Sequence, residues 1–305
     1  MSTTLGTIVD DMKQSLRIAK NNMLSYFLAN LGMAVLIGVL FAIIAIPFAV
    51  AALTVDPAFW VAFGQQLEAW AMNNPLLVGG IGTLVLIPIA ALFLVVVGSV
   101  FGMSTEAVET GETKAESAFS YFRHRFLSFA GLGVVLTVII ILPSLVIWGA
   151  ASIIVGGPIT GIPASILSIV TFVWTYITVG LFVLSFPAVA KGKGVQEALK
   201  ESYRFAIERF DRVYGLITAI IILAVVMFAP MIVWGILNAP MPPMPTTPPI
   251  MIDPVLAVIG AWTVVAGFLW LLLLLPMAVI AITKLYIEFT GGQVAQEPEP
   301  DIPMV

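Results

Sequence analysis

The side chains of this sequence that could do chemistry are mainly cations, and two groups of them are placed to bind anions. Arg123 and Arg125 alternate with aromatic residues in the run Phe122-Arg123-His124-Arg125-Phe126. Four more cations lie on one amphipathic segment: Lys200, Arg204, Arg209 and Arg212. Basic amphipathic segments beside apolar spans are typical contacts for anionic lipid headgroups or other phosphates. The alternative is that these cations only set membrane topology, with Glu201, Glu208 and Asp211 as local ion-pair partners.

A second candidate functional site is a row of hydroxyl side chains within one apolar run. Its central members are close to helical spacing, which places them on one side of a helix: Ser168, Thr171, Thr175 and Thr178. One interpretation is a polar lining for a conduit or a headgroup pocket. The other, which we favour, is that the hydroxyls bond to carbonyls of their own helix or pack closely against neighbouring helices.

The prolines are the third set of candidate functional residues, because each long apolar run contains one in its interior. They are Pro47, Pro88, Pro143, Pro187, Pro230 and Pro276. A proline inside a helix lacks the N–H that would bond to the carbonyl four residues earlier, so it frees that carbonyl and bends the helix. Freed carbonyls line some transport sites, but membrane helices also use proline simply to kink. The repetition favours kinks that serve packing.

Several kinds of chemistry are excluded or unsupported. The sequence contains no cysteine and a single histidine, His124, so disulfides, thiol catalysis and histidine-rich metal sites cannot form within one chain. It contains no phosphate-binding glycine loop, zinc-protease motif or nucleophile elbow. We therefore predict no catalytic residue, no metal and no cofactor. The net charge of -4 gives no basic excess, and we predict no nucleic-acid partner.

Membrane-spanning helices must position these residues. The chain of 305 residues is 60% hydrophobic and only 10% charged, unlike a soluble domain. Six runs contain no Asp, Glu, Lys, Arg or His: 24–53, 76–103, 127–155, 164–190, 213–237 and 255–283. Each exceeds the roughly 20 residues that a helix needs to cross a bilayer, and none alternates as a barrel strand would. We predict an all-α membrane protein with six transmembrane helices.

The basic residues predict how the chain is threaded. All 13 Lys and Arg side chains lie before the first run, between the second and third, between the fourth and fifth, or after the sixth. The alternate loops, 54–75, 156–163 and 238–254, contain none. Because basic residues are retained in the cytoplasm, we predict a multi-pass protein of the cell membrane with both termini cytoplasmic.

The chain also reads as three copies of one unit, each an interfacial amphipathic helix followed by a transmembrane hairpin. The predicted copies are 1–103, 104–190 and 191–290, and 291–305 is an acidic, proline-rich cytoplasmic tail. Gln14-Ser15-Leu16-Arg17 aligns with Glu201-Ser202-Tyr203-Arg204, and the interior prolines recur at similar offsets. In the first copy the apolar side of the amphipathic helix includes Val9, Met12 and Leu16.

The outer loops differ from one another. Asp56-Pro57 combines a good N-cap with a proline at the first helical position, so we predict that a short outer helix begins there. The loop 238–254 contains seven prolines and is predicted to be an extended polyproline segment.

One stretch is similar to a known arrangement. Glu197-Ala198-Leu199-Lys200-Glu201-Ser202-Tyr203-Arg204, continued by Arg209-Phe210 and a hydrophobic hairpin, resembles the membrane domain attached to some glycerophosphodiester phosphodiesterases. It also resembles a broad group of uncharacterised bacterial and archaeal six-span proteins. The resemblance implies the helix-plus-hairpin architecture over nearly the whole chain and a link to lipids. In the enzyme-linked relatives catalysis belongs to a separate soluble barrel, so the resemblance implies no catalytic residue here.

These observations favour a non-catalytic membrane scaffold or a subunit of a membrane complex that contacts lipid through its cytoplasmic helices. The expected partners are membrane lipids and either other membrane subunits or further copies of this chain. The main alternative is a transporter or channel for a lipidic or small neutral solute, built on the kinked helices. The predicted spans contain no charged residue at depth, which disfavours proton relays and ion-coupled carriers. An interfacial lipid-modifying enzyme is the least supported alternative.

Overall fold

The computed structural model describes residues 5–157, 159–237 and 254–295. Within these ranges all regular structure is helical, as predicted. The predicted polyproline loop lies almost entirely outside the described residues, as does the tail beyond residue 295.

Within the described ranges, six helical stretches are long and apolar enough to cross a membrane, which confirms the predicted number of spans. They are Met23–Ile43, Leu77–Thr110, Ala115–Val155, Gly161–Ala190, Phe210–Met227 and Val255–Phe289. Their large apolar side chains are widely exposed; Ile154, for example, is 85% and Ile162 77% exposed. Exposed apolar surface on this scale requires an apolar surrounding, so the chain is a polytopic membrane protein.

The chain divides into two compact units, which are described separately. Unit 1 comprises 1–27, 104–114 and 205–305, and unit 2 comprises 28–103 and 115–204. The predicted three-copy division uses other boundaries and stays a prediction.

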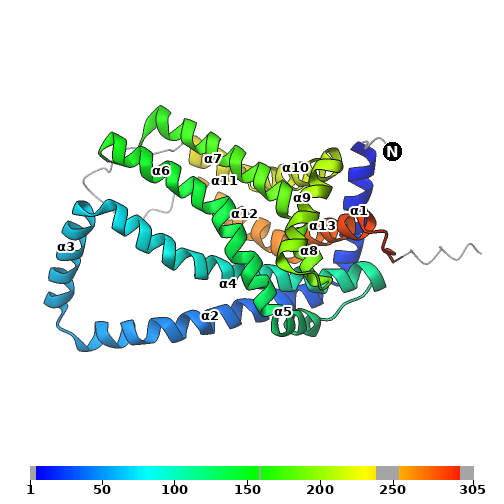
Figure 1. Ribbon diagram of the computed structural model, residues 1–305, viewed down its shortest axis with the longest axis horizontal. Coiled ribbons are helices and arrows are strands. Elements are labelled where there is room, and N and C mark those ends of the chain that lie inside the picture. Colours follow the sequence, from blue (N-terminus) through cyan, green and yellow to red (C-terminus); the bar gives the residue numbers. More distant parts are fainter. Residues whose placement is uncertain (1–4, 158, 238–253, 296–305) are drawn as a thin grey trace, which may run out of the picture. The chain divides into compact units, whose positions relative to one another are not determined.

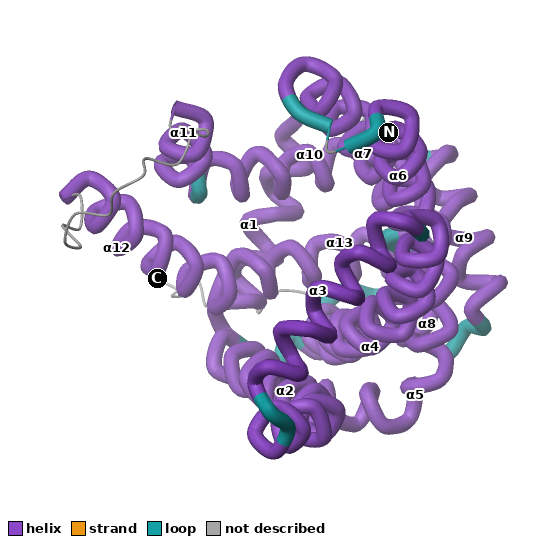
Figure 2. The backbone as a smooth tube through the Cα atoms, turned by 90° about the vertical axis from the view of Figure 1, so that its left-hand side faces the viewer, coloured by secondary structure: helices purple, strands orange, loops and turns teal. Residues whose placement is uncertain are grey.

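Unit 2 holds most of the long helices. They are α2 (Met23–Thr54, from Leu28 onward), α3 (Pro57–Asn73), α4 (Pro75–Thr110, as far as Met103), α5 (Ala115–Leu136), the π-helical turn η1 (Thr137–Ile141), α6 (Leu142–Val155), α7 (Gly161–Phe182), α8 (Ser185–Ala190) and the first part of α9 (Val195–Glu208). Figures 1 and 2 show α5 lying beside α8. The predicted second interfacial helix is not separate here, because its residues form the first turns of the helix that contains the third span.

The start of α3 confirms the helix predicted to begin at Asp56-Pro57, whereas its location outside the membrane stays a prediction. Asp56 is its N-cap, and the Asp56 carboxylate accepts a hydrogen bond from the backbone N–H of Ala58 at 2.8 Å. Pro57 occupies the first helical position, where a missing N–H costs nothing.

In the core of unit 2, aromatic rings of α5 pack against glycines of α4. Gly98 faces the ring of Phe129, which is fully buried, and Gly102 faces the ring of Tyr121. At Gly133 a side chain would meet the backbone of Ala91, with Ala91 Cα only 2.9 Å away. Small residues thus allow α4 and α5 to approach closely.

Unit 1 is built on α1 (Leu5–Asn21), α10 (Phe210–Met227), α11 (Ala229–Leu237), α12 (Pro254–Leu269), the π-helical turn η2 (Trp270–Leu274) and α13 (Leu275–Phe289). Figures 1 and 2 show α1 beside α13, whose residues from Pro276 to Ile287 are all buried. The buried side of α1 is Ile8, Ser15, Ile18 and Ala19. Of the predicted apolar side, Ala19 is fully buried and Val9 is 45% exposed, and its contact with the membrane interface stays a prediction.

Asn22, in the turn between α1 and α2, and Tyr26 of α2 anchor the segment 104–114 within unit 1. Asn22 donates to the carbonyl of Gly111 at 3.0 Å and accepts from the N–H of Thr113 at 2.8 Å. The buried hydroxyl of Tyr26 pairs with that of Ser104 at 2.8 Å. The short turn between α1 and α2 is therefore held by polar contacts that hydropathy patterns do not reveal.

Four of the six interior prolines lie at helix irregularities. Pro143 and Pro276 each follow a π-helical turn, Pro187 lies in α8 after the break that ends α7, and Pro230 follows the break between α10 and α11. Pro47 and Pro88 lie inside α2 and α4, which continue past them.

Tryptophans bond to backbone carbonyls at two of these irregularities. In unit 2, Trp174 Nε1 donates at 3.2 Å to the carbonyl of Ile139, the group that Pro143 leaves without its helical donor. In unit 1, Trp262 Nε1 donates at 2.9 Å to the carbonyl of Met227, where α10 ends. In a bilayer an unpaired carbonyl is costly, so these indoles stabilise the broken helices.

Candidate functional site

A cluster of charged and hydrogen-bonded side chains lies in unit 1, among α1, α10 and α13. Lys284 Nζ donates to Asp11 Oδ1 at 2.8 Å and to Gln14 Oε1 at 2.6 Å, and it lies 3.5 Å from Glu288 Oε1. Arg212 Nη2 donates to Asp11 Oδ2 at 2.9 Å and also bonds to Glu288 Oε2. We call these five residues, Asp11, Gln14, Arg212, Lys284 and Glu288, the charge cluster.

Helical spacing positions each member. Asp11 and Gln14 are three residues apart on α1, and Lys284 and Glu288 are four apart on α13, so each pair projects from one side of its helix. Arg212 enters from the first turn of α10. Asp11 joins all three helices, because each of its oxygens accepts from a different cation.

The charge cluster is largely withdrawn from water. The Lys284 side chain is 7% exposed and that of Asp11 13%, whereas Arg212 and Glu288 are each 26% exposed. A buried ammonium group is tolerated only when it is paired and hydrogen-bonded, and the three acceptors around Lys284 satisfy this requirement. The guanidinium of Arg212 also lies 5.9 Å from the centre of the Phe289 ring, within the range of a cation–π contact.

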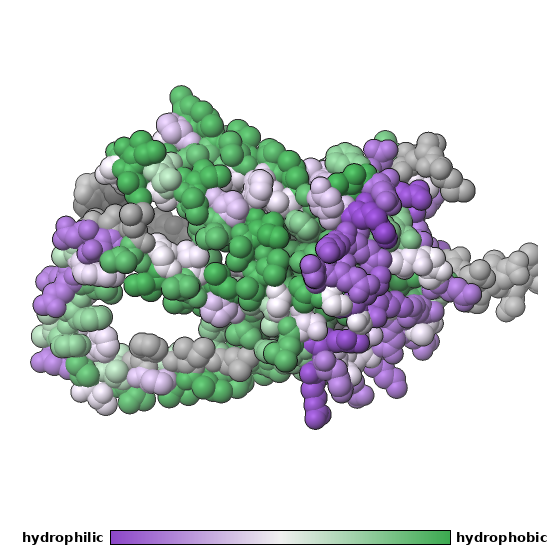
Figure 3. All heavy atoms as spheres, viewed as in Figure 1, coloured by the Kyte–Doolittle hydropathy of each residue, from purple (hydrophilic) through white to green (hydrophobic). Residues whose placement is uncertain are grey.

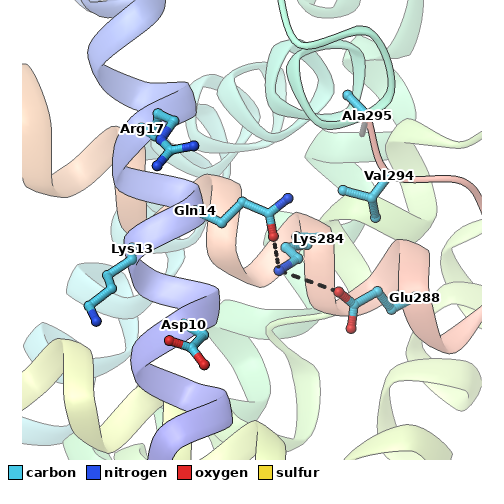
Figure 4. A pocket seen from close by; sticks show the side chains of 8 residues that line it. All are labelled: Asp10, Lys13, Gln14, Arg17, Lys284, Glu288, Val294 and Ala295. Carbon is cyan, nitrogen blue, oxygen red and sulfur yellow. Dashed lines mark hydrogen bonds and ion pairs between the residues drawn. The ribbon is translucent and has the colours of Figure 1, made fainter. Parts of the chain in front are cut away.

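A pocket of about 620 Å³ opens beside the charge cluster. Its lining comprises Asp10, Lys13, Gln14, Arg17, Lys284, Glu288, Val294 and Ala295. Figure 4 shows α1 on one side of the pocket and α13 on the other, with Val294 and Ala295 along the rim. The N–H of Ala295 donates to the carbonyl of Val108 at 2.8 Å, which holds this rim in place.

Sequence patterns did not point to four members of the charge cluster: Asp11, Gln14, Lys284 and Glu288. The predicted sixth span ended before Lys284, but its helix continues to Phe289 and carries both Lys284 and Glu288 into packed surroundings. The sequence feature that could have indicated the charge cluster was the four-residue spacing of Lys284 and Glu288 directly after an apolar run. The partners of Lys284 on α1 are 270 and 273 residues away in sequence, beyond the reach of any local pattern.

The predicted cations separate into different environments. Arg123, Lys200, Arg204 and Arg209 are exposed, and Arg125 is half-buried beside Gly192. Arg212 belongs to the charge cluster, and its partners are the distant Asp11 and Glu288 rather than the local Glu208 or Asp211. Glu201 does act as a local partner, but for Lys193, at 2.5 Å.

The predicted row of hydroxyl side chains on α7 bonds largely to its own helix. Ser168 donates to the carbonyl of Ala164 at 2.8 Å, Thr171 to that of Leu167 at 2.9 Å and Thr178 to that of Trp174 at 2.8 Å. Thr175 is half-buried, and its carbonyl lies 3.2 Å from the Thr178 hydroxyl. This is the arrangement expected when hydroxyls satisfy themselves within an apolar helix.

Unit 2 contains a smaller pocket, of about 220 Å³, beside the π-helical turn η1. It is lined by Leu94, Leu136, Thr137, Ile140, Ile141, Val179, Phe182, Val183 and Phe186. The Thr137 hydroxyl is already bonded to the carbonyl of Gly133 at 2.7 Å, which leaves the pocket walls apolar.

Among the described residues no group of three His, Asp or Glu side chains converges in the way that a metal site requires. No protein-family model, curated protein or solved structure matches this chain. The fold and the site therefore define it as a polytopic helical membrane protein with a charge cluster beside a polar pocket.

Proposed function

We propose that this chain is a non-catalytic scaffold or complex subunit of the cell membrane that binds anionic lipid headgroups through its cytoplasmic helices. The supporting observation is an exposed surface on α9, made of Lys200, Tyr203 and Arg204, which we call the α9 surface. Tyr203 is 48% exposed, with Lys200 three residues before it and Arg204 directly after it. Other membrane subunits or further copies of the chain are the proposed protein partners.

The geometry of α9 supports this proposal. Ala198 and Ser202 are buried, and the Ser202 hydroxyl donates to the carbonyl of Leu181 at 2.7 Å, so that side of the helix is packed within unit 2. The opposite side carries the α9 surface, and the Tyr203 ring stacks on Phe182 with 6.5 Å between ring centres. Figure 3 shows hydrophobic side chains over α6 and α7 and hydrophilic ones gathered in the region of α8 and α9. Tyrosine flanked by cations is typical of the boundary between acyl chains and headgroups.

Replacing Lys200 and Arg204 together by glutamine should weaken the preference for anionic lipid. A cation near an anionic membrane surface contributes about 1 kcal/mol, so losing two lowers the preference by roughly thirtyfold at low salt. The measurement is the ratio of phosphatidylglycerol to phosphatidylcholine that remains with the full-length protein after purification in neutral detergent. The matched control replaces Lys20 and Lys114, which lie on other segments, by glutamine. An equal fall in both double variants would attribute the preference to net charge and would count against the α9 surface.

The proposed orientation, with both termini cytoplasmic, has a direct test because the sequence contains no cysteine. Lys114→Cys should resist a membrane-impermeant maleimide in sealed cells and react after permeabilisation, since it lies in a predicted cytoplasmic segment. Glu68→Cys, on the predicted outer helix, should react in both conditions. Both side chains are exposed, so local burial does not decide the result. Reaction of Lys114→Cys in sealed cells would overturn the orientation.

We also propose that the second and third predicted copies share an origin, and the two tryptophan contacts support this. Ile139 and Met227 are 88 residues apart, as are Trp174 and Trp262. Each indole thus bonds to a carbonyl near a helix break at the same place in its copy. Inherited repeats explain this coincidence better than independent origin does. The link to lipid-associated six-span proteins remains part of the same proposal.

Transport of a lipidic or small neutral solute is the alternative function. It would need polar groups directed into a passage, and Ser168, Thr171 and Thr178 instead donate to carbonyls of their own helix. The pocket beside η1 has apolar walls. These contacts favour the scaffold over the transporter.

A further inference from the structure

We propose that the apolar pocket beside η1, which we call the η1 pocket, holds one acyl chain of the phospholipid whose headgroup contacts the α9 surface. Its lining comes from α4, α5, η1, α7, α8 and the residue between α7 and α8, all within unit 2, as is the α9 surface. The inference rests on the proposed function and deepens it, because it extends a headgroup contact to a site for a whole lipid molecule.

The walls of the η1 pocket offer nothing to a polar ligand. Thr137 is the one polar residue in the lining that the structure describes, and its hydroxyl already donates to the carbonyl of Gly133 at 2.7 Å. The carbonyl of Ile139, in the same π-helical turn, accepts from Trp174. A buried water molecule needs two to four polar partners, so water is not held here. The occupant that these walls select is therefore apolar.

The size and the exposure of the η1 pocket fit a slender chain. Leu136 and Phe186 are buried, whereas Val179 and Phe182 are half-buried, so the pocket is partly open and a chain can enter from the side. Its volume of about 220 Å³ is below the roughly 300–1,000 Å³ of pockets that hold drug-sized ligands. An unbranched acyl chain suits such a pocket better than a bulky solute does.

Phe182 connects the η1 pocket to the α9 surface. Its side chain lines the pocket, and its ring stacks on Tyr203 with 6.5 Å between ring centres. The Ser202 hydroxyl donates to the carbonyl of Leu181 at 2.7 Å, which fixes α9 beside the end of α7. A lipid with its phosphate on the α9 surface therefore needs to pass only the Tyr203 and Phe182 rings before its chain reaches the pocket.

The depth of the η1 pocket also fits an acyl chain. Lys191 follows the end of α8, and Phe186 and Val179 of the pocket lining lie five and twelve residues before it. At the rise of an α-helix these separations correspond to about 8 and 18 Å. One leaflet supplies about half of a hydrocarbon core of roughly 30 Å. The pocket therefore extends over the depth at which the acyl chains of one leaflet lie.

The test is photo-crosslinking of the full-length protein in phosphatidylcholine vesicles. The vesicles contain a trace of one of two probes, a phosphatidylglycerol or a phosphatidylcholine with a diazirine halfway along one acyl chain, and mass spectrometry locates the labelled peptides. Labelling over 136–141 should be about fivefold stronger than at Ile222 and Val226, because fixed walls on several sides hold a chain longer than a convex helix surface does. Ile222 and Val226 are 58% and 64% exposed and report ordinary lipid contact.

Substitutions that fill the η1 pocket should remove this labelling. Val179→Phe should lower it about fivefold with both probes, because the occupant is the chain that the probes share. Val173→Phe is the matched control: the same substitution on α7, at a side chain that is 46% exposed and outside the lining, should leave the labelling unchanged. Leu94→Phe fills the pocket from α4 and should reproduce the loss if Val179→Phe lowers the thermal midpoint of the protein.

Two results would overturn the acyl-chain site: labelling over 136–141 no stronger than at Ile222 and Val226, or an equal loss in Val179→Phe and Val173→Phe. An unlabelled pocket in a protein that mass photometry shows to be dimeric would assign the pocket to a second copy and also overturn the proposal. The Lys200→Gln/Arg204→Gln variant should lose the advantage of the phosphatidylglycerol probe but keep its labelling by the phosphatidylcholine probe. If it keeps that advantage, the α9 surface fails while the acyl-chain site stands, so the two failures are distinguishable.

Discussion

Replacing Asp11 by alanine should lower the free energy of unfolding by about 3–5 kcal/mol. Asp11 is the closest carboxylate to Lys284, at 2.8 Å, and it also accepts from Arg212 at 2.9 Å. Removing it leaves a 7% exposed ammonium group with Gln14 and a carboxylate at 3.5 Å as its remaining acceptors. In neutral detergent the thermal midpoint should fall by roughly 6–20 °C.

Two further variants separate a charge effect from a general weakening of α1. Asp10→Ala, on the same helix but exposed, should change stability by no more than about 0.5 kcal/mol. Asp11→Leu combined with Lys284→Leu should recover most of the loss, because neither charge then remains buried alone. If Asp10→Ala and Asp11→Ala had equal effects, or if the double variant were as unstable as Asp11→Ala, the account of the charge cluster would be wrong.

Replacing Gly98 by alanine should destabilise unit 2 by about 1–3 kcal/mol. A Cβ at this position would lie 2.6 Å from both Cγ and Cε1 of Phe129, far inside van der Waals contact. The Phe129 ring is fully buried, so it cannot move aside into open space. The measurement is the thermal midpoint of the full-length protein in detergent micelles.

Gly82→Ala is the matched control, since Gly82 lies on the same helix and a Cβ there would meet no atom within 4 Å. Both substitutions gain up to about 1 kcal/mol of helix propensity, so their difference isolates the ring contact. Gly82→Ala should be neutral or slightly stabilising. A Gly98→Ala protein as stable as Gly82→Ala would show that α4 and α5 are not in the close contact described.

Hydropathy was sufficient to predict the spans, because the lipid bilayer places one simple requirement on an apolar segment. A run of about 20 apolar residues must form a helix when no water is present to satisfy its backbone groups. The start of α3 was equally predictable, since Asp56 and Pro57 act on the first turn through local geometry alone.

The environment of individual cations was not predictable in this way. Arg209 and Arg212 lie three residues apart in the same amphipathic segment. Arg212 nevertheless bonds to Asp11 and Glu288, whereas Arg209 is exposed. Which cation is buried depends on how α10 is rotated against α1 and α13. That rotation is set by packing at positions such as Gly215, whose missing side chain makes room for Ile8.

The sequence by itself determined that the chain is helical, that it has six apolar stretches long enough to span a membrane and where α3 begins, because these features depend on local composition and on neighbouring residues. Only the tertiary structure brought Asp11, Arg212 and Lys284 together, and only it placed a polar pocket beside them. The physical reason is that a buried charge can persist only next to an opposite one, and its partner can come from any part of the chain that packing brings within about 3 Å.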